Sequence, residues 1–132
     1  MRISALLLGA ALIAATPALA GDRDTTPEAQ LAKALEGRVA GQPVDCISLP
    51  RVNGSRVFDK TAIVYESGST LYVNRPSIGA ESLDDDDILV SKTIGSQLCR
   101  MDTINLVDRA SRFQRGFVGL GSFVPYTKPR AQ

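Results

Sequence analysis

The sequence contains no histidine. Its absence excludes the Ser-His-Asp and Cys-His arrangements that activate a nucleophile, and zinc sites built on histidine. A Ser-x-x-Lys pair is also missing, because the positions three residues before the four lysines hold Gln30, Val57, Leu89 and Pro125. What remains is hydrolysis by two carboxylates roughly 5 to 10 Å apart across a cleft, for which a small domain has little room. We therefore expect a non-enzymatic protein without a cofactor, and keep a carboxylate-dependent hydrolase as an alternative.

Long hydrophobic runs are missing after residue 20, and the run before it is short. One positive charge precedes an apolar run at 3–15, and small residues then occupy the recognition positions of a signal peptidase. A membrane anchor would need roughly 20 apolar residues. The pattern predicts a signal peptide at 1–20 with cleavage between Ala20 and Gly21. It also predicts a periplasmic protein with no membrane span in its mature form.

An excess of either charge is missing as well. Loss of Arg2 with the signal peptide would leave 14 basic against 14 acidic side chains. Nucleic-acid binding needs a positive surface that replaces phosphate counterions, so we expect no nucleic acid as a partner. The mature chain, 21–132, is long enough for a single domain.

Cysteine is scarce: Cys46 and Cys99 are the two in the chain. In an exported protein an even count indicates a disulfide, since nothing outside the cytoplasm keeps thiols reduced. A redox pair would normally have the Cys-x-x-Cys spacing, which this pair does not have. We therefore predict a structural disulfide, and a bridged pair also leaves no thiol nucleophile.

Two hydrophobic periods divide the mature chain. Residues 26–36 predict one short helix, with Thr26 as N-cap, Pro27 in the first turn and Gly37 after the end. From 44 to 126 the period is two, which is typical of strands separated by turns, with Asn53-Gly54-Ser55 as one tight turn. The fold class is therefore mainly β, a small antiparallel barrel or sandwich of about six strands with one short N-terminal helix. The expected strands are 44–49, 56–58, 62–66, 70–74, 88–94, 103–108 and 116–126.

The segment "GFVGLG" at 116–121 is similar to a nucleotide-binding glycine loop. Such a loop must open a helix, whereas "SFVPY" follows here and is typical of a strand. In one continuous strand, Phe117, Gly119, Gly121 and Phe123 share a face. Glycines in that position indicate strong curvature or the close approach of another segment, and we predict that they close a barrel.

Four consecutive aspartates precede the apolar segment at 88–90. A solvated turn that keeps this strand from pairing with other molecules is the favoured interpretation. Pairing with the basic segment that holds Arg109, Arg112 and Arg115 is a second interpretation. The third is a weak calcium site, although the spacing is not that of an EF-hand loop. The candidate ligands are Asp84, Asp85, Asp86 and Asp87.

Four ordered segments carry a resemblance: "CISL" at 46–49, "LYVNR" at 71–75, "QLCRMD" at 97–102 and "LGSFVP" at 120–125. In this order and spacing they resemble an uncharacterised domain-of-unknown-function family of small exported proteobacterial proteins. The resemblance implies an exported fold and no activity. It also implies a second cysteine pair that this chain lacks, which would leave Cys46 to pair with Cys99.

These observations predict a small exported binding or accessory domain of unknown ligand, with an envelope protein as the conceivable partner. A protein inhibitor of a cell-envelope hydrolase is the first alternative, and it would present a protruding loop at 76–87 or 109–115. A carboxylate-dependent hydrolase is the second alternative, and it would show two acids facing each other across a pocket.

Overall fold

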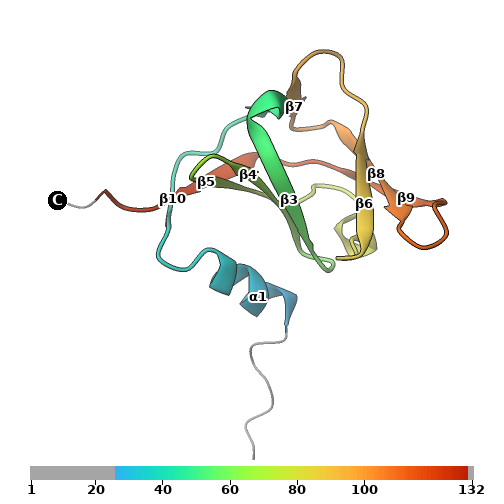
Figure 1. The fold of residues 1–132 in the computed structure, drawn as a ribbon, viewed down its shortest axis with the longest axis horizontal. Helices are drawn as coiled ribbons and strands as arrows, with labels where there is room; N and C mark the ends of the chain where they lie inside the picture. The colour runs from blue at the N-terminus through green and yellow to red at the C-terminus, as the bar shows by residue number, and fades with distance from the viewer. Residues whose placement is uncertain (1–25, 131–132) are drawn as a thin grey trace, which may run out of the picture.

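The computed structural model describes residues 26–130, so the predicted signal peptide and the Ala20–Gly21 cleavage site lie outside the described residues. The described chain is mainly β, with one α-helix before the first strand (Figure 1). No helix within 26–130 is long and apolar enough to cross a membrane. The elements, in chain order, are α1 (Pro27–Ala34), β1 (Val39–Ala40), β2 (Cys46–Ser48), η2 (Leu49–Arg51), β3 (Val52–Phe58), β4 (Ala62–Ser67), β5 (Thr70–Asn74), η3 (Ala80–Ser82), β6 (Asp87–Ser91), β7 (Gln97–Cys99), β8 (Thr103–Asp108), β9 (Gln114–Gly119) and β10 (Phe123–Thr127).

The strands form three antiparallel sheets. A five-stranded sheet has the order β1-β10-β5-β4-β3, a three-stranded sheet has the order β6-β8-β9, and β2 pairs with β7 as a short ribbon. The sheets are not closed into a barrel but are arranged like a sandwich, which decides between the two predicted architectures. The main core lies between the five-stranded sheet on one side and the other two sheets on the opposite side.

Strand β4 is buried on both of its faces. Ile63 and Tyr65 point into the main core, whereas Ala62 and Val64 join a second apolar cluster with Leu31 of α1. Alternate residues of a strand point to opposite sides of a sheet, so this strand needs a cover on each side. Helix α1 therefore covers the second face of the five-stranded sheet.

Local sequence signals set the start of α1. Thr26 is the N-cap, and its hydroxyl accepts a hydrogen bond from the Ala29 amide at 3.2 Å. Pro27 occupies the first turn, where its missing N–H leaves no bond unmade. Glu28 pairs with Arg75 at the end of β5, 2.6 Å away. The helix ends at Ala34, earlier than the expected residue 36, and Gly37 follows with a φ of 76°.

Two short strands were missed by the sequence pattern, and one turn was wrong. Strand β1 has two residues and strand β7 has three, which is too few to show a period of two. Asn53-Gly54-Ser55 lies inside β3 rather than in a turn, and the register shifts between Val52 and Gly54 as in a β-bulge. A bulge uses the same small residues as a turn, which explains the error.

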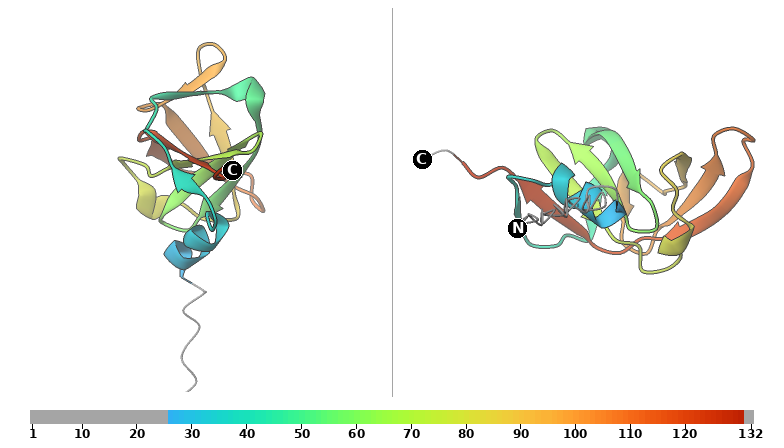
Figure 2. Two further views of the ribbon diagram at one scale, coloured as in Figure 1. Left: turned by 90° about the vertical axis from the view of Figure 1, so that its left-hand side faces the viewer. Right: turned by 90° about the horizontal axis from the view of Figure 1, so that it is seen from below.

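The predicted strand 116–126 is also wrong, because it divides into β9 and β10. The two strands belong to different sheets, and residues 120–122 carry the chain from one sheet to the other. The β8–β9 hairpin extends away from the rest of the molecule, as the right-hand view of Figure 2 shows.

Candidate functional site

The four aspartates do not form one solvated turn. Asp87 is the first residue of β6 and only 7% exposed, so the prediction that its side chain lies in water is wrong. Its carboxylate pairs with the Arg115 guanidinium, whose Nε lies 3.1 Å from Oδ1. The same guanidinium donates to the Ser82 carbonyl at 2.6 Å. Burial of a carboxylate is tolerated because the charge is paired and hydrogen-bonded.

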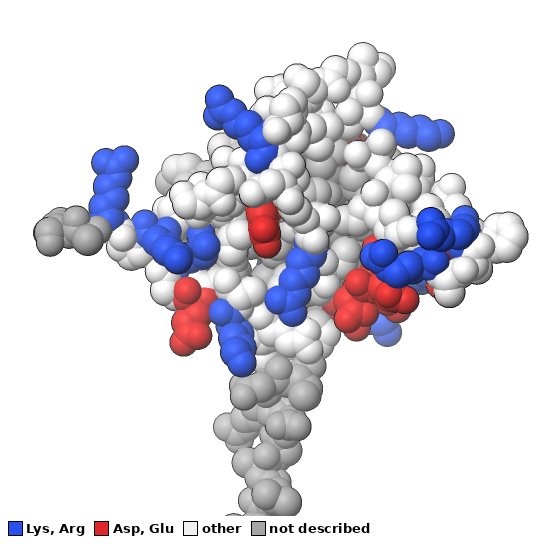
Figure 3. Space-filling model, viewed as in Figure 1, with Lys and Arg blue, Asp and Glu red and all other residues white. Residues whose placement is uncertain are grey.

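Asp86 also pairs internally, although in a more exposed setting. Its Oδ1 lies 3.4 Å from Nε of Arg109, and both side chains are more than half exposed. The second interpretation of the aspartate run, pairing with the basic segment, therefore holds for Asp86 and Asp87. Acidic and basic side chains adjoin on the right-hand part of the molecule in Figure 3.

Asp84 and Asp85 remain exposed and are joined by a third acid that the sequence did not indicate. Carboxylate oxygens of Asp59, Asp84 and Asp85 lie within 4.8 Å of one another. The Asp85 amide also donates to Asp59 Oδ1 at 2.6 Å. Repulsion from Asp59, with smaller effects of desolvation and of the neighbouring Asp84 and Asp86, raises the pKa of Asp85 above that of an ordinary aspartate. Each of the three residues offers one carboxylate oxygen to this group, which makes three of the six or more oxygens that calcium prefers.

Asp59 was missed because it is 25 residues from Asp84 in the chain. It lies in the turn between β3 and β4, and the Lys60 amide of that turn donates to the Leu83 carbonyl at 3.1 Å. This bond holds the two turns together. Only the tertiary structure brings these acids to one place.

The loop of the β8–β9 hairpin, 109–113, is built as a tight turn. The Asp108 carboxylate accepts a hydrogen bond from the Ser111 amide at 2.6 Å, and the Arg112 amide donates to the Asp108 carbonyl at 2.9 Å. The hydrogen bonds from Ser111 lower the pKa of Asp108. Arg112 has a φ of 64°, and Phe113 beside it is 77% exposed. The loop thus holds an aromatic side chain in water.

The outer face of the β6–β8–β9 sheet is only partly polar. Val90 of β6 and Phe117 of β9 flank Asn105 of β8 in one row across the three strands. Val90 is 38% exposed and Phe117 54% exposed. Ile78, which bridges to Gly119 at the edge of β9, is 64% exposed. Exposed apolar side chains grouped in this way are typical of an interaction surface.

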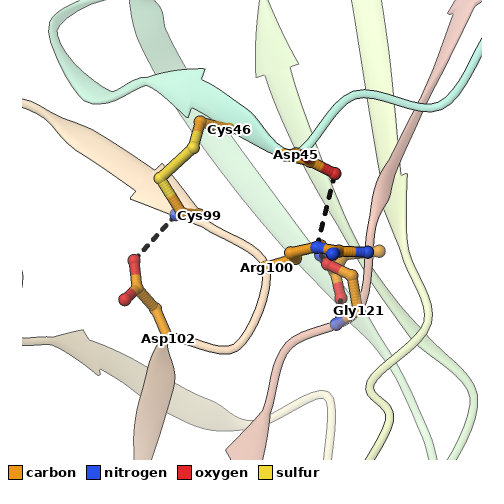
Figure 4. The surroundings of a disulfide bond; sticks show 7 residues. Asp45, Cys46, Cys99, Arg100, Asp102 and Gly121 are labelled. Atoms are coloured by element: carbon orange, nitrogen blue, oxygen red, sulfur yellow. Dashed lines mark hydrogen bonds and ion pairs between the residues drawn. A yellow bond between two sulfur atoms is a disulfide. The ribbon is translucent and has the colours of Figure 1, made fainter.

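The predicted disulfide joins Cys46 of β2 to Cys99 of β7 (Figure 4). The two cysteines are opposite each other in the antiparallel ribbon, with 3.9 Å between their Cα atoms. Asp102 accepts a hydrogen bond from the Cys99 amide at 2.7 Å, and Asp45 pairs with Arg100 at 3.4 Å. The neighbours Ile47 and Leu98 are buried in the main core. The bridge is therefore part of the scaffold.

The glycines of 116–121 do not close a barrel, and the corresponding prediction is wrong. The predicted close approach of another segment is confirmed at Gly121, where a Cβ would lie 2.5 Å from the Arg75 carbonyl oxygen. The buried Asn74 side chain fixes this contact by donating to the Gly121 carbonyl at 2.8 Å and accepting from its amide at 3.0 Å. A second position of this kind, Gly79, would place a Cβ 2.7 Å from the Phe117 carbonyl oxygen.

Tyr65 is the one buried side chain within 26–130 whose polar atom makes no hydrogen bond. Its ring packs against Phe123 with 5.9 Å between centroids, and burial raises the pKa of its hydroxyl far above the usual range. The residue is 5% exposed, so its hydroxyl cannot meet a substrate from the surface.

No family model, curated protein or solved structure matches this chain. The resemblance to a domain-of-unknown-function family therefore stays a prediction. Function has to be argued from the surfaces described above.

Proposed function

We propose that this chain is an exported, non-enzymatic binding or accessory domain that acts on another protein of the cell envelope. The observation that carries the proposal is the β8–β9 hairpin loop, 109–113. It protrudes, its turn is fixed by the Asp108 hydrogen bonds, and it exposes Phe113. An aromatic side chain held in water by a fixed loop is a suitable anchor for a pocket on a partner.

Two cavities of the described surface favour a binding role over hydrolysis. A cavity of about 270 Å³ beside α1 has Glu28 as its one acid, and that carboxylate is paired with Arg75. A cavity of about 200 Å³ near β10 is lined by no acid. Carboxylate-dependent hydrolysis would need two acids across one such cavity.

The same loop also supports the alternative that the protein inhibits a cell-envelope hydrolase. A protein inhibitor of an envelope hydrolase would insert a fixed, protruding loop into the cleft of its target, and 109–113 lies within one of the two segments expected for that role. Inhibition would be one form of the proposed binding, and it requires no further site on this chain.

The test places a photo-crosslinking amino acid at position 113 in cells that express the full chain. The matched control has the same amino acid at position 94, because Ile94 is, like Phe113, strongly exposed but lies in the β6–β7 loop. We expect one envelope protein to be cross-linked from position 113 and not from 94. In a chain without the crosslinking amino acid, Phe113→Ser should abolish co-purification of that envelope protein. Equal products from both positions would contradict the proposal.

The location is tested separately. Protein recovered from the periplasm should begin at Gly21, because the signal peptide would be removed there. If the protein were recovered from the cytoplasm and began at Met1, the proposed location would be wrong.

A further inference from the structure

A cavity of about 200 Å³ lies where β5 and β10 meet on the outer face of the five-stranded sheet. Its lining residues are Val73, Arg75, Ser122, Val124 and Tyr126. Val73 and Val124 are opposite each other in the antiparallel ladder, and Tyr126 follows Val124 on the same side of its strand. Arg75 and Ser122 adjoin the two strands at the other end of this row.

The lining combines apolar surface with a few polar groups. Val73 and Val124 supply the apolar part, and Val73 is buried beneath the surface. Arg75 supplies a positive charge, and the hydroxyl of Ser122 makes no hydrogen bond with any residue of 26–130. A largely apolar cavity with a small number of convergent polar groups is the usual form of a site for a small molecule.

The guanidinium of Arg75 is shared between this cavity and the larger cavity beside α1. On the α1 side it donates to the two carboxylate oxygens of Glu28, from Nη1 at 2.6 Å and from Nη2 at 3.1 Å. A guanidinium has five N–H groups, so three stay available for another acceptor. Glu28 does not line the smaller cavity, which therefore contains a cation and no acid.

The Arg75–Glu28 pair is also easily rearranged. The two side chains are 55% and 64% exposed, and an ion pair in such a setting contributes little to stability. A carboxylate from solution can therefore share the guanidinium with Glu28 or displace it without unfolding the chain.

We propose that this cavity binds a small monocarboxylate with a short apolar body. Arg75 holds the carboxylate through N–H groups that Glu28 leaves unused, and the Ser122 hydroxyl is a second donor. The apolar body lies against Val73 and Val124, where its burial removes apolar surface from water. The volume is below the roughly 300 to 1,000 Å³ of typical ligand pockets, which favours a small ligand.

The charge and the backbone around the cavity narrow the ligand further. One guanidinium balances one carboxylate, whereas a phosphate dianion would keep an unbalanced charge beside two valines. A peptide C-terminus is normally captured by a nest of backbone N–H groups. The backbone of β5 and β10 is instead paired within the sheet. A free acid therefore fits better than the end of a chain.

This site goes beyond the proposed function and can be tested separately from it. Figure 1 shows β5 and β10 at one side of the molecule and β9, which follows the hairpin loop, at the other. Phe113→Ser should therefore leave binding of the acid unchanged. Arg75→Gln should leave the protein that is cross-linked from position 113 unchanged.

An NMR titration of the purified, isotope-labelled protein with sodium hexanoate tests the inference. We expect saturable shifts of the backbone amides of 122–124 at millimolar hexanoate. Hexanol has the same apolar body without the charge, and it should bind at least roughly tenfold more weakly, because it loses a charge-assisted hydrogen bond.

Substitutions on the two sides of the ion pair should have opposite effects. Arg75→Gln should weaken hexanoate binding at least roughly tenfold. Glu28→Gln should strengthen it, because the guanidinium is no longer shared with another carboxylate. Arg100→Gln is the matched control, since Arg100 is 57% exposed and forms an exposed ion pair with Asp45 on another part of the molecule. It should bind like the wild type.

A further variant keeps Arg75 in place. Val124→Asp adds a negative charge to the cavity and should also abolish binding, and circular dichroism checks that each variant folds. The absence of saturable shifts with hexanoate would overturn the inference, as would equal binding by the wild type and Arg75→Gln. Hexanol that binds as tightly as hexanoate would overturn the carboxylate as the recognised group. Tighter binding of inorganic phosphate, or of a peptide that ends in valine, would overturn the free acid as the ligand.

Discussion

Inward-pointing and outward-pointing residues of the β6–β8–β9 sheet alternate along the same strands but meet different surroundings. Ile104, Leu106 and Val118 on the inner face are at most 1% exposed, whereas Val90 and Phe117 on the outer face are 38% and 54% exposed. The strand residues are of similar kind on both sides. Burial depends on whether another layer covers the face, which the strand sequence alone does not show.

The aspartate run repeats this contrast at a smaller scale. Asp87 points to the inner side and is paired with Arg115, whereas Asp85 is exposed beside Asp59. Two residues of the same type, two positions apart, therefore have opposite electrostatic surroundings. Asp87 contributes a paired charge to the scaffold, and Asp85 adds to a crowded group of acids.

The largest expected loss of stability follows removal of the disulfide between Cys46 and Cys99. Cys46→Ala combined with Cys99→Ala should lower the free energy of unfolding by about 4 kcal/mol, because the unfolded chain regains the freedom of a 53-residue loop. Urea denaturation under oxidising conditions measures the loss. Free thiols in the native wild-type protein, detected by alkylation, would contradict the disulfide.

A matched pair of substitutions compares the two faces directly. Leu106→Ala should lower the free energy of unfolding by about 3 to 4 kcal/mol, because it leaves a cavity in a fully buried position. Val90→Ala on the outer face should change it by less than about 0.5 kcal/mol. Urea denaturation of both variants measures the difference. Similar losses for both variants would show that the outer face is covered within one chain.

Breaking the Asp87–Arg115 ion pair should cause the next smaller loss of stability. Arg115→Ala should lower the free energy of unfolding by about 3 kcal/mol, because it leaves the Asp87 carboxylate, 3% exposed, without its partner. This expected loss is at the low end for breaking a buried ion pair, because the Arg115 side chain is 39% exposed and water can reach the site. Asp87→Asn should be less harmful, since the remaining guanidinium can be hydrated. A loss below about 1 kcal/mol for Arg115→Ala would mean that the carboxylate is hydrated in the native protein.

Asp85→Asn should have the smallest effect, and it should be stabilising. The folded-state pKa of Asp85 is raised above 3.8, so its ionised form opposes folding at neutral pH, and this opposition fades as the pH falls through the folded-state pKa. The melting temperature of Asp85→Asn should therefore exceed that of the wild type slightly at pH 7, and the difference should vanish near about pH 3.

Calcium provides the control for this position. Calcium at about 1 mM should not raise the melting temperature, since a ligand that binds only the folded state would have to stabilise it. A rise of several degrees that Asp85→Asn abolishes would show that Asp59, Asp84 and Asp85 form a cation site.

Several features could be predicted because their signals are local or covalent. The N-cap at Thr26 and the mainly β composition depend on residues close in the chain, and the pairing of two cysteines needs only their number and an oxidising compartment. The strands 62–66, 70–74 and 103–108 were placed within one residue of β4, β5 and β8. Shorter strands and the bulge at Val52–Gly54 carried no distinct local signal.

What the sequence determined by itself is therefore the mainly β class and the cysteine pair available for a bridge. Tertiary structure alone decided that the sheets form a sandwich, that β4 is buried on both faces and that Asp87 is paired with Arg115. It also brought Asp59 to Asp84 and left Phe117 uncovered. The physical reason is distance along the chain: propensity and capping act within a few residues, whereas burial and charge pairing depend on segments that meet only when the sheets pack.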